Sequence, residues 1–125
     1  MLKQTIKMAI ATILLGGSVA VAGNVTDVLS KQEALSHTAL KAYKKHKAVA
    51  LVKQIHEIKV QNHKLQKQVR DHEIRNLLVF LDICLDEMKT TLKKPYSKDN
   101  AQIIADLSVS IQEGTHYVKK HWKYN

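Results

Sequence analysis

Histidine is the side chain through which this chain would most readily hold a transition metal, because seven of its 125 residues are histidines. A helix that binds zinc places its ligands three or four residues apart, as in Glu-x-x-His or His-x-x-x-His. His56 and His63 are seven apart, on one helix face but roughly 10 Å apart along its axis. His116 and His121 are five apart and diverge in direction. The spacing favours scattered solvent-facing histidines, and a metal site built from these four is the alternative.

Catalytic patterns are missing from the sequence. It has no nucleophile with a base nearby, no phosphate-binding glycine loop and no pair of carboxylates at a telling spacing. Asp82 and Asp86 share a helix face and are expected to form a solvated pair near Lys89 and Lys93. These observations argue against an enzyme.

Residues 1–22 have the three parts of a secretory signal peptide. Two lysines give a basic start, residues 8–22 form an uncharged run, and an Ala-Val-Ala triplet ends it. The rival reading is a membrane anchor, but a spanning helix needs about 20 apolar residues, and this run has 15 with two glycines inside it. We therefore expect cleavage after Ala22, a periplasmic or secreted location and one domain over residues 23–125.

The chain is basic, with a formal net charge of +9, which loss of the two lysines of the signal would lower to +7. Export, and the lack of basic runs interleaved with aromatics, argue against nucleic acid as the partner. A solvated basic surface, attraction to anionic envelope components and a small-anion ligand all fit this charge. Cys84 is the only cysteine, so we expect no internal disulfide and an inert buried thiol.

Helix is expected throughout the domain. No glycine lies between Asn24 and Gln112, and Pro95 is the only proline, whereas the turns of a β protein need Gly, Pro, Asn and Asp. The first helix is expected to begin near Thr26 or Asp27. Its inward positions are expected to be Val28, Gln32, Leu35, Ala39 and Ala42, with Tyr43 beside them.

Three further apolar stripes follow. The second, with the alternating four and three spacing of a bundle seam, comprises Leu51, Ile55, Ile58, Asn62, Leu65 and Val69. The third is the broadest and comprises Ile74, Leu77, Leu78, Leu81, Cys84, Leu85, Met88 and Leu92. The fourth comprises Ile104, Leu107, Ile111, Gly114, Val118 and then His121 or Trp122.

The connections between these stripes decide the topology. The phase slip between the first and second stripes means a tight turn within residues 44–48 or a bend in one long helix, and we favour the turn. Residues 94–100 are the clear loop, with Asp99 or Asn100 as the cap of the last helix. Asn62 is expected to set helix register, and Gly114 to permit a close crossing. Short connections between amphipathic helices predict an all-α, antiparallel four-helix bundle after a cleaved signal peptide.

The first helix resembles the opening helix of the type IV pili methyl-accepting chemotaxis transducer N-terminal domain, a PilJ-like family related to nitrate/nitrite sensor kinases. The residues that carry the resemblance are Gln32, Leu35, Ser36 and Lys41-Ala42-Tyr43. It implies a sensory bundle that binds a ligand on helix one. Gln32, Ser36 and Lys41 are then candidate ligand contacts or helix-packing positions.

The first helix also departs from the family's pattern. Ser30 and Glu33 stand where the family has Gly and Arg, Ala34 replaces Met, and His37 replaces Gln. In the nitrate sensors that arginine holds the anion at a dimer interface, so nitrate binding does not carry over. Lys31 and His37 are candidates to supply the positive charge instead, and a homodimer through the first helix is one arrangement that the resemblance implies.

A shorter resemblance concerns His121-Trp122-Lys123-Tyr124, which is similar to the closing His-x-Lys-Tyr of small periplasmic b-type cytochromes, where the His ligates haem. Those proteins also need a methionine on the first helix, and no Met lies between Gly23 and Leu85.

Three functions are therefore compared. The favoured one is an exported, non-enzymatic sensory domain that binds a small ligand or an envelope protein. A haem or metal carrier that uses His121 with other histidines is the first alternative, and a structural or interaction protein of the cell envelope is the second.

Overall fold

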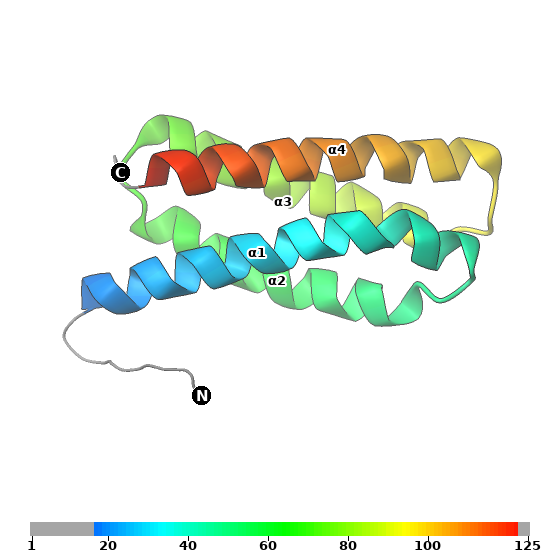
Figure 1. Cartoon of the computed structure of the whole chain (residues 1–125), viewed down its shortest axis with the longest axis horizontal. Coiled ribbons are helices and arrows are strands. Elements are labelled where there is room, and N and C mark those ends of the chain that lie inside the picture. The colour runs from blue at the N-terminus through cyan, green and yellow to red at the C-terminus, as the bar shows by residue number, and fades with distance from the viewer. Residues whose placement is uncertain (1–16, 123–125) are drawn as a thin grey trace.

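The computed structural model describes residues 17–122, and within this range the chain forms four α-helices and no strand. They are α1 (Gly17–Lys44), α2 (Val49–Gln68), α3 (His72–Leu92) and α4 (Lys98–His121). The helices alternate in direction, and α1 and α3 each pack against both α2 and α4 (Figure 1). The prediction of an all-α chain with four helices is confirmed.

The start of α1 differs from the prediction. The helix is continuous from Gly17 rather than from Thr26 or Asp27, because no proline interrupts residues 17–26 and neither predicted cap breaks the helical backbone. Residues 1–16 of the predicted signal peptide lie outside the described residues. Among the side chains that the structure describes, Val25 is the first in the chain that is buried in the core. Within residues 17–122, no helix is both long enough and apolar enough to cross a membrane.

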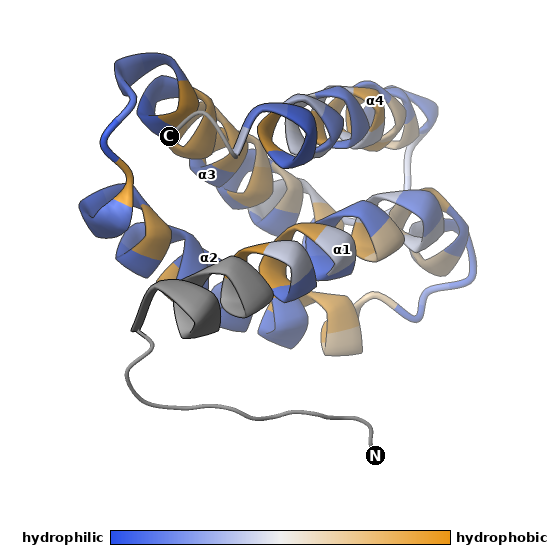
Figure 2. Ribbon diagram, turned by 60° about the vertical axis from the view of Figure 1, so that its left-hand side comes forward, coloured by the Kyte–Doolittle hydropathy of each residue, from blue (hydrophilic) through white to orange (hydrophobic). Residues whose placement is uncertain are grey.

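The core lies between the four apolar faces, which Figure 2 shows turned toward the interior of the bundle. Helix α3 contributes most to it, and all of its predicted apolar positions are buried except Leu77, which is half-buried. The predicted stripe of α2 is buried throughout. In α1, Leu29 is buried although it was not predicted, and Ala42 is half-buried.

The α1–α2 connection is a tight turn, as favoured by the sequence. His46 has φ 60°, in the left-handed region that closes many helix C-termini. The backbone N–H of Lys47 donates to the Ala42 carbonyl at 2.8 Å, and that of His46 donates to the Tyr43 carbonyl at 3.1 Å. These two bonds end α1, so α1 and α2 are separate helices.

Side chains cap the N-termini of α3 and α4. Asp71 accepts a hydrogen bond from the backbone N–H of Ile74 at the start of α3. Helix α3 ends at Leu92, before Pro95, as expected. The predicted cap of α4 at Asp99 or Asn100 is wrong: Ser97 is the cap, and its hydroxyl accepts from the backbone N–H of Asn100. The helix therefore begins two to three residues earlier than the sequence indicated.

Gly114 permits a close crossing of α3 and α4, as predicted. A Cβ atom at this position would lie 2.8 Å from Cδ2 of Leu81. Because Leu81 is completely buried, its side chain has little room to move aside.

Candidate functional site

Gln32, a predicted ligand contact on α1, is buried and paired inside the bundle. Its Nε2 donates to Oδ1 of Asn62 at 2.7 Å, and Nδ2 of Asn62 donates back to Oε1 of Gln32 at 3.2 Å. Both side chains are fully buried. Since buried amides need partners, each satisfies the other, and together they link α1 to α2 at one register.

Ser36 is also buried, and its hydroxyl donates to the Glu33 carbonyl one turn earlier, at 2.6 Å. A serine hydroxyl that is bonded within its own helix can pack at a crossing without an unpaired polar group. Gln32 and Ser36 therefore occupy helix-packing positions in the structure.

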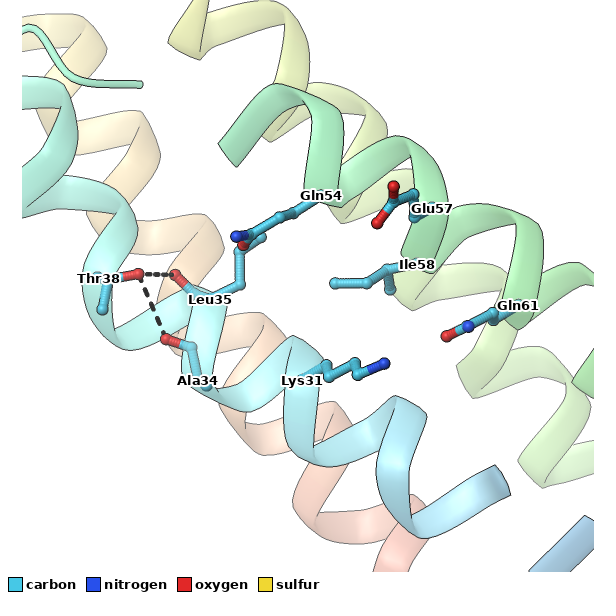
Figure 3. Close-up of a pocket in the computed structure, with 8 residues that line it drawn as sticks. All are labelled: Lys31, Ala34, Leu35, Thr38, Gln54, Glu57, Ile58 and Gln61. Carbon is cyan, nitrogen blue, oxygen red and sulfur yellow. Dashed lines mark hydrogen bonds between the residues drawn. The ribbon is translucent and has the colours of Figure 1, made fainter. Parts of the chain in front are cut away.

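Lys31 lies at an open groove between α1 and α2 (Figure 3). The groove has a volume of about 390 Å³. It is lined by Lys31, Ala34, Leu35 and Thr38 from α1 and by Gln54, Glu57, Ile58 and Gln61 from α2. Helix α1 packs more closely against α4 than against α2, which explains why the space opens on this side.

The groove combines an apolar floor with polar edges. Leu35 and Ile58 are buried and form the floor, while Lys31, Glu57 and Gln61 extend from the two sides (Figure 3). Sites for small molecules are typically concave and mostly apolar, with a few polar groups that orient the ligand. The sequence did not identify the α2 side of this groove, because its polar residues look like any solvated helix face.

Lys31 is held only weakly by its own helix. Its ammonium lies 3.2 Å from a carboxylate oxygen of Asp27, and more than half of each side chain is exposed. An exposed ion pair of this kind contributes about 0–1 kcal/mol, so a ligand anion can compete for the lysine.

The two remaining candidates on α1 lie away from this groove. His37 is exposed, and its Nδ1 is 3.5 Å from Nε2 of Gln112 on α4. Lys41 is exposed in the last turn of α1. The structure therefore does not gather the five candidates, Lys31, Gln32, Ser36, His37 and Lys41, into one site.

Glu33, which stands where the PilJ-like pattern has an arginine, faces α4. Its carboxylate accepts a hydrogen bond from the Lys119 ammonium at 2.7 Å. This hydrogen bond, together with the lysine's charge, lowers the pKa of the Glu33 carboxyl. Glu33 therefore stabilises the contact between α1 and α4.

The histidines of the alternative metal site are spread over the bundle. His56 and His63 lie on α2, and His116 and His121 lie on α4, which packs mainly against α1 and α3. No group of three or more His, Cys, Asp or Glu side chains in the described part of the chain is placed to hold a metal ion.

The predicted solvated pair on α3 holds for Asp86, whose side chain is 60% exposed, but is wrong for Asp82, whose side chain is only 15% exposed, and both carboxylates bind side chains of α2. Asp82 lies 2.6 Å from Nε2 of His63, and Asp86 accepts from the Lys59 ammonium at 2.5 Å. The lysine lowers the pKa of Asp86. These two pairs connect α2 to α3.

Cys84 is buried on α3, and burial raises the pKa of its thiol. A thiol that stays protonated is a poor nucleophile and a poor metal ligand. Cys84 does not line the α1–α2 groove.

Comparisons with protein-family models, with curated proteins and with solved structures found no match to this chain.

Proposed function

We propose that the chain is an exported, non-enzymatic domain of the sensory type, which binds a small organic anion in the α1–α2 groove. The observation that supports this most is the position of Lys31 beside an apolar floor in a space of about 390 Å³. That volume lies within the range of roughly 300–1,000 Å³ that is usual for small-molecule sites.

Each part of such a ligand has a counterpart in the groove. Its anionic group pairs with the Lys31 ammonium, and its apolar body covers Leu35 and Ile58. The amides of Gln54 and Gln61 supply donors and acceptors for further polar atoms. Glu57 would repel a second anionic group, so a ligand with one negative charge, or a zwitterion, fits better than a dianion.

Ligand binding would also bear on the contact between α1 and α2. Leu35 lies one helical turn after Gln32, and Ile58 one turn before Asn62, so the floor adjoins the buried amide pair. A ligand that binds one spacing of the two helices more tightly shifts the population toward it. A protein partner that contacts α1 and α2 would then detect the change in their spacing.

A thermal melt with candidate ligands tests the proposal. The panel comprises nitrate, nitrite, short and aromatic carboxylates, and amino acids, with haem, zinc and copper added to test the carrier alternative. A ligand at 100 times its Kd stabilises the fold by about 2.7 kcal/mol, which is a shift of several degrees for a domain of this size.

Variants then locate the site. Lys31→Ala is expected to abolish the shift, whereas the matched control Lys41→Ala removes an exposed lysine of the same helix outside the groove and is expected to keep it. A shift that survives Lys31→Ala, or one produced only by haem or a metal, would reject the groove as the ligand site.

A further inference from the structure

The end of the bundle that carries the α1–α2 turn and the α3–α4 loop is strongly basic. Figure 1 shows both connections at this end. We define the basic end as the six exposed lysines in residues 44–49 and 93–99: Lys44, Lys45, Lys47, Lys93, Lys94 and Lys98. Asp99 is the one acidic residue in these two segments. The lysines are thus concentrated on one small surface.

Contacts of Tyr43, in the last turn of α1, hold the α3–α4 loop beside the α1–α2 turn. The Tyr43 hydroxyl donates to the Pro95 carbonyl at 2.6 Å. The ring of Tyr43 also lies 5.5 Å, centroid to centroid, from that of Tyr96. The lysines of the two connections therefore form one continuous surface rather than lying on two independent loops.

Helix stability explains four of these six lysines. Lys44, Lys45, Lys93 and Lys94 lie at the C-terminal ends of α1 and α3, where positive charge is favourable, and the backbone N–H of Lys45 still donates to the Lys41 carbonyl of α1. Lys47 and Lys98 instead lie at the N-termini of α2 and α4, where positive charge is unfavourable. Helix α2 has no acidic residue in its first turn and no side-chain cap, so nothing in its first turn compensates for Lys47.

Apolar side chains are exposed among the lysines. Val49 is 84% exposed and Tyr96 is 45% exposed. Both line a hollow of about 320 Å³ between the connections, together with Leu92 and Pro95. A soluble polyanion gains little from an exposed valine, whereas a lipid interface takes up valine and tyrosine side chains and attracts lysines at the same time.

We propose that the basic end docks on the surface of an anionic lipid bilayer, with Val49 and Tyr96 entering the headgroup region and the lysines pairing with lipid phosphates. Stable attachment to a membrane surface needs two signals, and here a small apolar contact is combined with a basic cluster. The α1–α2 groove lies along the side of the bundle, so this contact is independent of the proposed ligand site.

Co-sedimentation with vesicles tests the proposal, using phosphatidylglycerol mixed with phosphatidylcholine and, separately, phosphatidylcholine alone. We expect binding to the anionic vesicles only, weakening as salt is raised. Each lysine near an anionic surface strengthens binding about fivefold. The variant Lys45→Gln/Lys47→Gln is therefore expected to bind about 25-fold more weakly. Its melting temperature is expected to stay close to that of wild type, because Lys45 lies at the favourable C-terminal end of α1 and Lys47 at the unfavourable N-terminus of α2; an unchanged melt excludes misfolding as the cause.

Matched variants distinguish a specific effect of the basic end on vesicle binding from an effect of the protein's net charge. Lys64→Gln/Lys67→Gln removes the same charge from exposed positions near the other end of α2, and it is expected to bind vesicles within a few-fold of wild type. Val49→Ser is expected to weaken vesicle binding without changing its salt dependence. Equal losses in the two lysine variants, unchanged binding of Val49→Ser, or equally tight binding to soluble polyphosphate would overturn the proposal.

Discussion

The buried amide pair between α1 and α2 allows a sharp test of what holds these helices in register. Replacing Asn62 with Leu keeps a side chain of similar shape but removes both hydrogen bonds to Gln32, at 2.7 and 3.2 Å. The Gln32 amide is fully buried, so water cannot replace the lost partner. Its donor and its acceptor would both stay unpaired.

The expected cost follows from that geometry. A buried polar group without a partner costs about 1–3 kcal/mol, so two such groups cost roughly 2–5 kcal/mol. The whole stability of a domain is only about 5–15 kcal/mol. Asn62→Leu should therefore lower Tm by about 8 °C or more. Gln32→Met, which leaves the buried Asn62 amide without its partner, should lower Tm by a similar amount.

A double-mutant cycle separates the pair from simple packing. When both partners become apolar, no buried group is left unpaired and the change can be nearly neutral. We expect the double variant Gln32→Met/Asn62→Leu to recover most of the stability, with a coupling free energy of at least about 2 kcal/mol. Urea unfolding followed by circular dichroism measures all four free energies of unfolding.

Two outcomes would refute this reasoning. A stable Asn62→Leu variant would mean that the Gln32 amide has other partners or reaches water. Additive losses in the double variant would mean that the two side chains act through separate contacts, and the amide pair would then not set the register of α1 and α2.

Three further predictions concern the other contacts. Gly114→Ala should destabilise the fold by about 1 kcal/mol despite the better helix propensity of alanine, because the new methyl group would clash with buried Leu81. An increase in Tm would mean that Leu81 moves aside freely. Glu33→Gln should cost less than about 1 kcal/mol at pH 7, since the ion pair with Lys119 is partly exposed. The pKa of Glu33 is lowered in the folded state. Its contribution to stability is therefore fully present above the unfolded pKa of about 4.3 and is lost as the pH falls through the folded pKa. The two proteins should then have equal stability in acid, and a difference in stability that persists there would point to another cause. His46→Gly should stabilise the fold by roughly 0.5–1 kcal/mol, because φ 60° strains a residue with a side chain, and a loss in a urea titration would show that the imidazole makes a contact worth more than that strain.

The helices and most of the core were predictable because they depend on local spacing. The α2 stripe from Leu51 to Val69 repeats at four and three, and only one face of a helix can bury such a set. The start of α1 and the cap of α4 were not predictable to the residue, because Thr26, Asp99 and Asn100 are all acceptable caps and only the observed backbone selects among them.

The site was less predictable, because it depends on how two helices face each other. Helical spacing placed Gln32 and Asn62 on inward faces, but it did not show that they would meet across 30 positions of sequence. Lys31 was identified through the resemblance of α1 to a sensory helix. Its neighbours Gln54 and Gln61 carried no signal, since a groove arises from the separation of α1 and α2 and no local pattern encodes that distance.

The alternating direction of the helices has a practical consequence for handling the protein. The start of α1 and the end of α4 lie at the same end of the bundle, and the basic end lies at the other (Figure 1). An affinity handle, a fluorophore or a biosensor linkage attached directly at the first turns of α1 or the last turn of α4 would therefore lie at the opposite end of the bundle from the six lysines. Immobilised by such a linkage, the protein would present its lysines and Val49 outward to a passing vesicle, while the α1–α2 groove along its side would stay open to solutes.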